Sequence, residues 1–309
     1  MAGVSLLALI FPGQGSQRSG MGAPWRDHPS WWVVDRLGAA SGRDVAGLLL
    51  DADAETLRQT RNAQPATFAL SLVILDAARQ AGLLDAPVAA VAGHSLGEYS
   101  ALVAAGALEH EEAARLVAER GEAMQAAAEA APGTMAAVLG LEPELVAAAC
   151  KDVDGVWVAN DNAPGQVVVA GTAAGIEAAS ARARDLGAKR VLPLPVGGAF
   201  HSPLMAAAQE RLEQALAGAA FGAATTPVVA NVDAAPHLDG FPALLGAQLA
   251  APVRWRESLL TMRGLGAGTF VELGPGGELS GMVKRTVDGA ERVTVNTPDD
   301  LEAARARLA

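Results

Sequence analysis

Cysteine is almost absent from this chain of 309 residues, since Cys150 is the only one. A single cysteine excludes an internal disulfide and any zinc site built from several cysteines. Aromatic residues make up only 4% of a chain that is 51% hydrophobic, so the core must consist mainly of alanine, valine and leucine. The length is that of one large domain or two smaller ones, and the low charged fraction of 18% excludes a disordered chain.

Positive charge is scarce as well, with 23 Lys and Arg against 34 Asp and Glu and a net charge of −11. Binding to nucleic acid without sequence preference needs a basic face, so the composition argues against a nucleic-acid partner. The apolar run at residues 6–11 is too short for a signal peptide or a membrane span, and no basic residue precedes it. We therefore expect a cytoplasmic protein that does not bind membranes, and a monomer.

Strand and helix patterns alternate along the first 130 residues. Apolar runs at 5–11 and 87–92 predict buried parallel strands, and apolar spacing or composition predicts helices at 31–41, 64–82, after Ser95, and at 109–130. This alternation indicates an α/β fold with a parallel sheet.

The pattern changes at Ala131-Pro132-Gly133. The following segment predicts strand, helix, strand, strand, helix and strand in that order, at 134–140, 143–151, 155–160, 166–170, 173–186 and 189–195. This is the order of a small ferredoxin-like unit. We therefore predict a subdomain at residues 133–199, inserted into a catalytic core formed by residues 1–132 and 200–309.

The strongest local signal is Gly93-His94-Ser95-Leu96-Gly97, a G-x-S-x-G match that follows an apolar strand and precedes a helix. In such an elbow the serine lies on a sharp turn with its hydroxyl exposed, and the start of the helix favours developing negative charge. We interpret Ser95 as a nucleophile; the alternative is a structural turn.

A nucleophilic serine needs a base, and the chain has five histidines. His94 adjoins the serine and should point elsewhere. His28 and His110 lie in polar stretches that we expect to be exposed, and His237 lies in a loop rich in Pro, Asp and Gly. His201 follows Gly-Gly-Ala-Phe after an apolar strand and is the best candidate, unless it only caps the next helix.

The tetrahedral intermediate needs hydrogen-bond donors for its oxyanion. We expect one from the backbone N–H of Leu96 and a second from Gln14, in the Gly13-Gln14-Gly15 turn after the first strand. That turn could instead cradle a phosphate, but it has neither G-x-G-x-x-G spacing nor a Gly-Lys-Ser/Thr ending.

Several longer motifs occur in the chain: FPGQGSQ at 11–17, GHSLGEYSAL at 93–102, NAPGQVV at 162–168, LPLPV at 192–196, PVRW at 252–255 and ELGPG at 272–276. Together they resemble the motifs of malonyl-CoA:acyl carrier protein transacylases and of the acyltransferase domains of polyketide synthases, and they occur in family order from about residue 5 to 297.

The resemblance implies an α/β-hydrolase-like core carrying a ferredoxin-like insert. It implies that Ser95 is the acylated nucleophile and His201 its base, oriented by the backbone carbonyl of Gln248. Arg120 would pair with the free carboxylate of a malonyl group, and Asn162 would also bind substrate. Without the resemblance, Arg120 would be interpreted as a surface residue paired with Glu119 or Glu122 on an amphipathic helix.

Phe200, just before the histidine, refines the expected substrate. In the related polyketide acyltransferases a phenylalanine at this position accompanies malonyl and a serine accompanies methylmalonyl, because a ring leaves little room for a branch. Gly198 departs from the polyketide pattern, which often has histidine there, and Phe200 departs from many fatty-acid enzymes, which have serine. Malonyl is therefore favoured, with fatty-acid synthesis, a polyketide assembly line and malonate decarboxylation as alternative settings.

The implied reaction transfers malonyl from malonyl-CoA to the phosphopantetheine thiol of an acyl carrier protein, with no metal or bound cofactor. Carrier proteins are generally acidic, so docking needs a local basic patch. The two adjacent basic pairs, Lys189-Arg190 and Lys284-Arg285, are expected to flank the cleft entrance; alternatively, they are ordinary solvated charges.

Three rival functions remain. A polyketide acyltransferase acting in trans could use another carboxyacyl-CoA. A serine thioesterase or hydrolase shares the elbow, although Arg120 and the Gln14 turn speak against it. A docking module without activity would not need Ser95, His201 and Arg120 together.

Overall fold

A six-stranded sheet forms the centre of the larger part of the protein. The computed structural model describes residues 6–308. The strand order is β10-β9-β1-β2-β7-β8; neighbours from β10 to β7 are parallel, and β8 is antiparallel to β7. The strands are β1 (Leu6–Phe11), β2 (Val88–Gly93), β7 (Val228–Val229), β8 (Pro236–His237), β9 (Ala267–Leu273) and β10 (Glu291–Val295).

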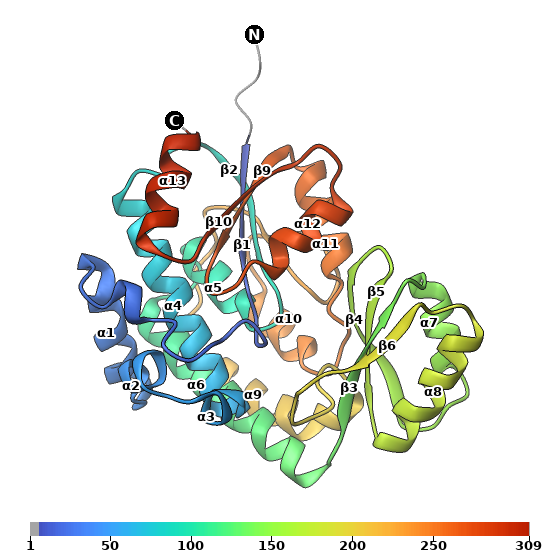
Figure 1. Ribbon diagram of the computed structural model, residues 1–309. Coiled ribbons are helices and arrows are strands. Elements are labelled where there is room, and N and C mark those ends of the chain that lie inside the picture. The colour runs from blue at the N-terminus through green and yellow to red at the C-terminus, as the bar shows by residue number, and fades with distance from the viewer. Residues whose placement is uncertain (1–5, 309) are drawn as a thin grey trace.

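Helices cover both faces of this sheet (Figure 1). The helices of this part are α1 (Trp32–Ser41), α2 (Val45–Leu50), α3 (Ala54–Arg58), α4 (Thr60–Gln80), α5 (Gly97–Ala104), α6 (His110–Ala130), α9 (Ala206–Ala217), α10 (Phe241–Gln248), α11 (Trp255–Gly264), α12 (Glu278–Thr286) and α13 (Pro298–Leu308), with short 3₁₀ turns at Ala23–Trp25, Pro29–Trp31 and Pro203–Met205.

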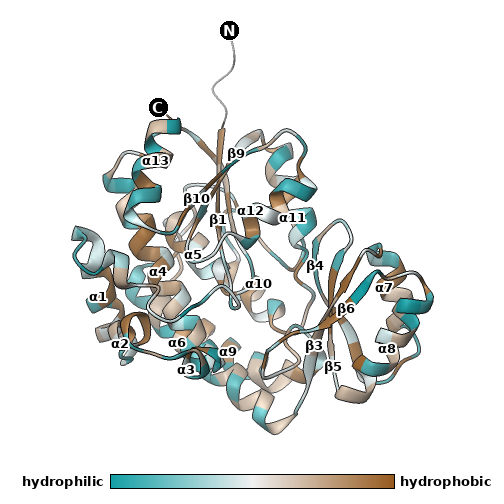
Figure 2. Cartoon of the chain, in the orientation of Figure 1, coloured by the Kyte–Doolittle hydropathy of each residue, from teal (hydrophilic) through white to brown (hydrophobic). Residues whose placement is uncertain are grey.

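The buried side chains of β1 alternate between two cores. Leu7, Leu9 and Phe11 pack with α4, α5 and α6, whereas Ala8 and Ile10 pack with α11 and α12 on the other face. Because both faces are covered, the strand is apolar at every position, and β1 and β9 are largely brown in Figure 2. This confirms the predicted parallel α/β arrangement.

A separate antiparallel sheet has the strand order β4-β5-β3-β6. Its elements follow the predicted strand–helix–strand–strand–helix–strand order: β3 (Thr134–Leu139), α7 (Pro143–Cys150), β4 (Val156–Ala163), β5 (Gln166–Gly171), α8 (Ala173–Asp185) and β6 (Arg190–Pro193). Helices α7 and α8 pack on one face, where Val138 and Val169 are buried. Met135 and Val168, on the opposite face, pack toward the larger part.

The two sheets are joined by backbone pairing. The Asp161 N–H donates to the Val253 carbonyl at 2.9 Å, and the Val253 N–H donates to the Ala159 carbonyl at 2.8 Å. Arg256 adds an ion pair to Asp161 at 2.8 Å. Strand β4 is thereby tied to the segment before α11, which fixes one side of the space between the sheets.

The sequence-based boundaries need small corrections. The helix predicted from residue 64 begins at Thr60 and contains Pro65, and the strand predicted at 155–160 continues to Ala163. The first strand was predicted from residue 5, which lies outside the described residues, as does residue 309. Within residues 6–308, no helix is both long enough and apolar enough to cross a bilayer.

Candidate active site

Ser95 lies at the tip of a tight turn between β2 and α5. Its φ of +51° is in the left-handed region, which side chains other than glycine seldom adopt. A Cβ on Gly93 would lie 1.8 Å from the Gly97 carbonyl carbon, and a Cβ on Gly97 would lie 2.2 Å from the Phe11 oxygen. Both flanking glycines are therefore required by close backbone approach, as expected for an elbow that exposes its serine.

Asn231 holds this turn, and the sequence analysis did not identify it. Its Oδ1 accepts the Ser95 backbone N–H at 2.7 Å, and its Nδ2 donates to the Gly93 carbonyl at 2.8 Å. The side chain is fully buried. A signal was available, because Asn231 directly follows the apolar Val228-Val229-Ala230 beside β2, where polar residues meet at the carboxyl ends of parallel strands.

His201 meets the serine hydroxyl as predicted. Its Nε2 is 2.7 Å from Ser95 Oγ, and its Nδ1 is 3.0 Å from the backbone oxygen of Gln248. A carbonyl oxygen only accepts, so Nδ1 carries the proton and Nε2 is free to take one from the hydroxyl. His201 also has a positive φ, of +56°.

Burial keeps this imidazole neutral. Burial, and next the positive charge of Arg120, lower the pKa of His201 to about 3. The backbone carbonyl of Gln248 opposes this change. His201 is therefore in its base form at neutral pH, and its orientation comes from a carbonyl rather than from a carboxylate.

Arg120, from α6, lies beside the same hydroxyl with only 1% of its surface exposed. Nη1 donates to Gln64 Oε1 at 2.8 Å, and Nη2 donates to Gln248 Oε1 at 2.9 Å and to Ser95 Oγ at 3.0 Å. The Tyr99 ring lies 5.9 Å from its guanidinium carbon. Within residues 6–308 no carboxylate contacts this cation, and its pKa is lowered by burial.

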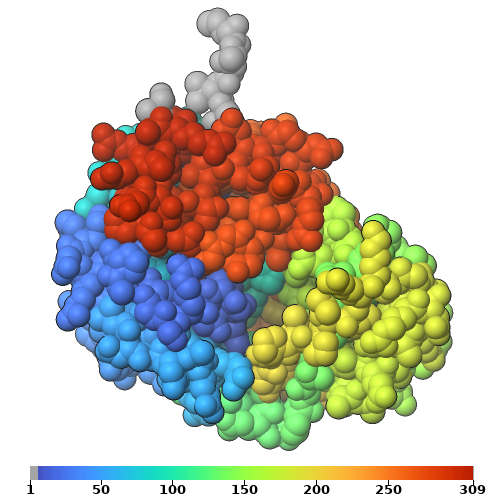
Figure 3. Space-filling model, viewed as in Figure 1, coloured from blue at the N-terminus to red at the C-terminus, as the bar shows by residue number. Residues whose placement is uncertain are grey.

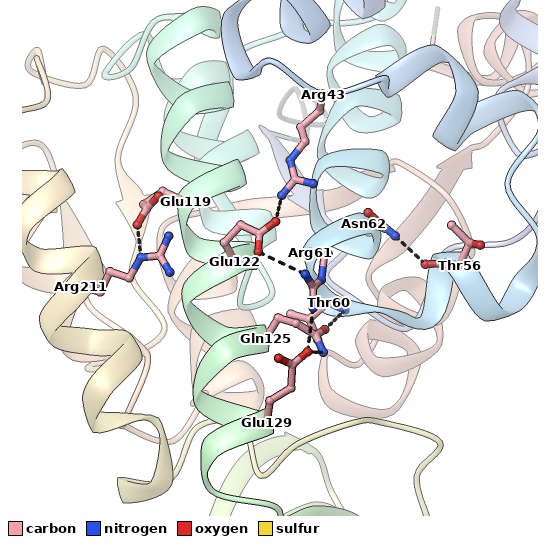
Figure 4. Close-up of polar contacts among 10 residues, drawn as sticks. All are labelled: Arg43, Thr56, Thr60, Arg61, Asn62, Glu119, Glu122, Gln125, Glu129 and Arg211. Carbon is pink, nitrogen blue, oxygen red and sulfur yellow. Dashed lines mark hydrogen bonds and ion pairs between the residues drawn. The ribbon is translucent and has the colours of Figure 1, made fainter.

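The interpretation of Arg120 as a surface ion-pair residue is wrong. Glu119 pairs with Arg211, and Glu122 pairs with Arg43 and Arg61 (Figure 4). These neighbours lie on the outer sides of α6, whereas Arg120 is turned inward. Gln64, which the sequence analysis also missed, lies on α4 and holds the inward guanidinium.

The two expected oxyanion donors lie in adjacent turns, Leu96 within the elbow and Gln14 in the turn after β1. A Cβ on Gly13 would lie 2.4 Å from the His94 carbonyl oxygen, so the turn after β1 packs directly against the turn after β2. Neither the Gln14 nor the Leu96 backbone N–H makes a hydrogen bond within the described part of the chain. The Gln14 side-chain amide donates to the Thr60 hydroxyl at 3.3 Å, which leaves its backbone N–H as the candidate oxyanion donor.

The other histidines have partners of their own. His94 Nε2 is 2.8 Å from Asn162 Oδ1, away from the serine, and its ring packs edge-on against Trp255. Asn162 is thus a support for His94 as well as a residue of the pocket wall. His28 and His110 are partly buried: His28 Nδ1 accepts from the Ser30 N–H, and the His110 ring contacts Trp32.

These groups share a cavity of about 230 Å³ between the two sheets. Gln14, Ser95 and Arg120 line it from the larger part, Met135 and Val168 line it from the smaller sheet, and Phe200 lies beside His201. Figure 3 shows a hollow where the blue, yellow and orange-red segments meet. The cavity therefore has reactive groups at one wall and a mostly apolar surface elsewhere.

The four residues of the basic pairs are exposed and lie near one end of the smaller sheet. Lys284 and Arg285 are on α12, and Arg285 donates to Gln166 at the start of β5. Strand register places Gln166 opposite Leu139, and Leu139 opposite Arg190, which follows Lys189. The two pairs are thus neighbours across this sheet end, and α12 also contributes Leu279 and Met282 to the cavity.

Known proteins match this chain in sequence and fold over nearly its whole length. A family described as "Acyl transferase domain" matches residues 8–298. The malonyl CoA-acyl carrier protein transacylase of Bacillus subtilis (strain 168) is 40% identical, over 97% of this chain and 96% of that protein. An acyl carrier protein S-malonyltransferase structure from Vibrio cholerae is 41% identical with a TM-score of 0.92, covering 97% of this chain and 99% of that one. A malonyl-transacylase in complex with its type II PKS acyl-carrier protein is 37% identical with a TM-score of 0.93, covering 98% and 100%.

Proposed function

Because this chain belongs to the acyl transferase domain family, we propose that it transfers a malonyl group from malonyl-CoA to the phosphopantetheine thiol of an acyl carrier protein. The observation that carries the choice of acyl group is the buried Arg120. It touches the nucleophilic oxygen, and its described partners are all neutral. A desolvated cation without a carboxylate is costly, and a substrate carboxylate would compensate that cost.

The first half-reaction makes a malonyl ester on Ser95. The hydroxyl attacks the thioester carbonyl as His201 Nε2 accepts its proton, and the oxyanion lies against the backbone N–H groups of Gln14 and Leu96. The C–S bond then breaks, and His201 returns the proton to the departing CoA thiolate. The 2.7 Å contact between Ser95 and His201 supports this role for both side chains.

The second half-reaction reverses these steps with a different thiol. The carrier's pantetheine thiol gives its proton to His201 and attacks the ester carbonyl. The intermediate collapses with loss of Ser95, which recovers the proton from His201. Each proton is thus returned, and the nucleophile, base and anion-binding group are all protein side chains, so we propose that no bound cofactor takes part.

The short malonyl group suits a site in which the nucleophile, Ser95, and the cation, Arg120, lie next to each other. Only one methylene separates the reacting carbonyl from the carboxylate, and Arg120 Nη2 is 3.0 Å from the attacking oxygen. A guanidinium presents parallel N–H donors that match a carboxylate. An acyl group without a carboxylate would leave the cation unpaired, which favours malonyl over acetyl.

Phe200 and Asn162 complete the proposed acyl site. The Phe200 ring is mostly buried beside His201 and narrows the cavity where an α-branch would lie, so we propose that it selects malonyl over methylmalonyl. Asn162 keeps His94 turned away from Ser95 and forms part of the cavity wall.

We further propose that residues 1–132 and 200–309 form an α/β-hydrolase-like core and that residues 133–199 form a ferredoxin-like subdomain. The parallel sheet with covered faces and the β4-β5-β3-β6 order of the antiparallel sheet support this division. The carrier protein would dock on Lys189, Arg190, Lys284 and Arg285, which lie together at one end of the smaller sheet. A cytoplasmic location and a monomeric state stay predictions.

The experiment that tests the function gives the purified protein malonyl-CoA with and without a phosphopantetheinylated carrier protein. We expect a malonyl adduct on Ser95 by mass spectrometry and its transfer to the carrier. Ser95→Ala should form no adduct. Rapid release of free malonate without a carrier would identify a thioesterase instead, and absence of any adduct would favour a docking module.

A further inference from the structure

Glu98 is a buried acid that the reaction steps above do not use. It lies in the first turn of α5, three residues after Ser95, with 3% of its surface exposed. Burial raises the pKa of its carboxyl to about 8, against the opposing effects of the Gln248 side chain and the Asn231 backbone. At neutral pH it is therefore mostly uncharged. It does not line the cavity, so it cannot touch the acyl group.

Gln248 connects Glu98 to the reactive groups. Its side-chain Nε2 donates to Glu98 Oε2 and, at 3.0 Å, to the Ser95 carbonyl, while its Oε1 accepts from Arg120 Nη2 at 2.9 Å. Its backbone carbonyl accepts from His201. One glutamine thus contacts the nucleophile, the base and the cation, and it is held by Glu98, which does not line the cavity.

The orientation of the Gln248 side-chain amide decides whether it accepts a hydrogen bond from Arg120 or places its own N–H groups against the guanidinium. The two ends of an amide have similar shapes, but only the oxygen can accept from a guanidinium. An amide turned over would place its NH₂ group against Arg120 and remove the bond. The carbonyl oxygen of the Glu98 acid accepts from the NH₂ group even when the acid is protonated, and together with the Ser95 carbonyl it favours the correct orientation.

The amide also separates the acid from the cation. A carboxylate in direct contact with Arg120 would occupy the N–H groups that a substrate carboxylate needs. Here the acid contacts Gln248, and the described partners of the guanidinium remain the neutral Gln64, Gln248 and Ser95. The cation is fixed in place without being paired.

We infer that Glu98 is a positioning residue that sets the Gln248 amide and, through it, the Arg120 guanidinium for binding of the acyl carboxylate. The inference rests on the proposed malonyl transfer. It assigns Glu98 an effect on carboxylate recognition and little effect on the reactivity of Ser95, because the contact between His201 and Ser95 does not involve the Gln248 side chain.

The test compares Glu98→Leu, Glu98→Gln and Ser100→Ala. Leucine removes the acceptor at similar volume, and glutamine retains an acceptor oxygen without charge. Ser100 is a matched control on the same helix, since it is buried and its hydroxyl has no hydrogen-bond partner within residues 6–308. Steady-state malonyl transfer and the sulfonylation rate of Ser95 by phenylmethylsulfonyl fluoride are measured for each.

For Glu98→Leu we expect kcat/KM for malonyl-CoA to fall about 10- to 100-fold, mainly through KM, as for loss of a buried hydrogen bond. Its sulfonylation rate should stay within about threefold of wild type. Glu98→Gln should recover malonyl transfer to within about threefold, and Ser100→Ala should match wild type. If Glu98→Leu does not fold, Glu98→Asp, which withdraws the acceptor by one methylene, should show the same increase in KM.

Three results would overturn the inference. These are unchanged malonyl kinetics in Glu98→Leu or Glu98→Asp, equal losses of malonyl transfer and sulfonylation, and a Glu98→Gln variant as impaired as Glu98→Leu. Failure of the proposed function looks different: the wild-type protein would be sulfonylated at Ser95 yet transfer no malonyl group, which removes the basis of the inference as well.

Discussion

Replacement of Arg120 by methionine separates carboxylate recognition from the acyl-transfer chemistry. The variant keeps an unbranched buried side chain but removes the N–H groups that face Ser95, Gln64 and Gln248. Hydrogen bonds to a charged group contribute about 1.5–3 kcal/mol each, and two of them would bind the substrate carboxylate. A loss of about 3–6 kcal/mol corresponds to a fall of about 10²- to 10⁴-fold in kcat/KM for malonyl-CoA.

The assay follows acylation of Ser95 by malonyl-CoA and by acetyl-CoA. Acetyl-CoA has no carboxylate, so its acylation rate should be unchanged or increased in Arg120→Met, because the unpaired buried cation is gone. Arg120→Lys is the matched control: it keeps the charge without the paired N–H groups and should show an intermediate rate with malonyl-CoA. Equal losses for both thioesters would refute carboxylate recognition by Arg120 and would indicate that the residue only supports the serine.

Asn231→Ala removes two hydrogen bonds to the backbone of the elbow and should lower the free energy of unfolding by about 2–4 kcal/mol, measured by urea denaturation; an unchanged midpoint would contradict its clamping role. Because the pKa of His201 is lowered to about 3, the base stays unprotonated and the acylation rate of Ser95 should be flat from pH 5 to pH 7. In the unfolded chain His201 takes up a proton near its ordinary pKa of 6.5, whereas in the folded protein it does so only near pH 3. The free energy of unfolding should therefore fall as the pH falls from 6.5 toward 3, and urea midpoints measured across that range would detect the change. Phe200→Ala should raise the ratio of methylmalonyl to malonyl transfer in a competition assay, and an unchanged ratio would exclude Phe200 as the selective residue.

The fold was predictable because local patterns and packing agree. Apolar runs at β1 and β2 are buried on both faces, and many turns carry glycine or proline, so most element types and their order up to residue 195 followed from the sequence. Helices α2 and α3 and most of the elements after residue 200 were not predicted. Boundaries were less accurate where tertiary contacts extend an element. The Thr60 N–H at the start of α4 is accepted by the Gln125 side chain, a contact 65 positions away that no local pattern reveals.

Some residues of the active site could be predicted from local sequence patterns, and others could not. Ser95 and His201 could be found from local signals, a glycine-flanked turn and a histidine after a strand. The inward direction of Arg120 could not, because Glu119 and Glu122 give a plausible surface explanation until α4 and α9 are placed around α6. Asn231, Gln64 and Glu98 act through contacts between elements distant in sequence, so only the assembled fold reveals them.

Arg120 is held by the amides of Gln64 and Gln248 rather than by carboxylates, because its guanidinium must stay free to bind the substrate carboxylate. Arg120 Nη2 lies within 3.0 Å of both Ser95 Oγ and Gln248 Oε1, so an aspartate oriented toward His201 from the position of Gln248 would lie near the guanidinium and pair with it. Such a pair would neutralise the group that must bind the substrate carboxylate. A backbone carbonyl orients the imidazole equally well and carries no net charge. The substrate's own charge therefore explains why this serine and histidine work without a third acidic residue.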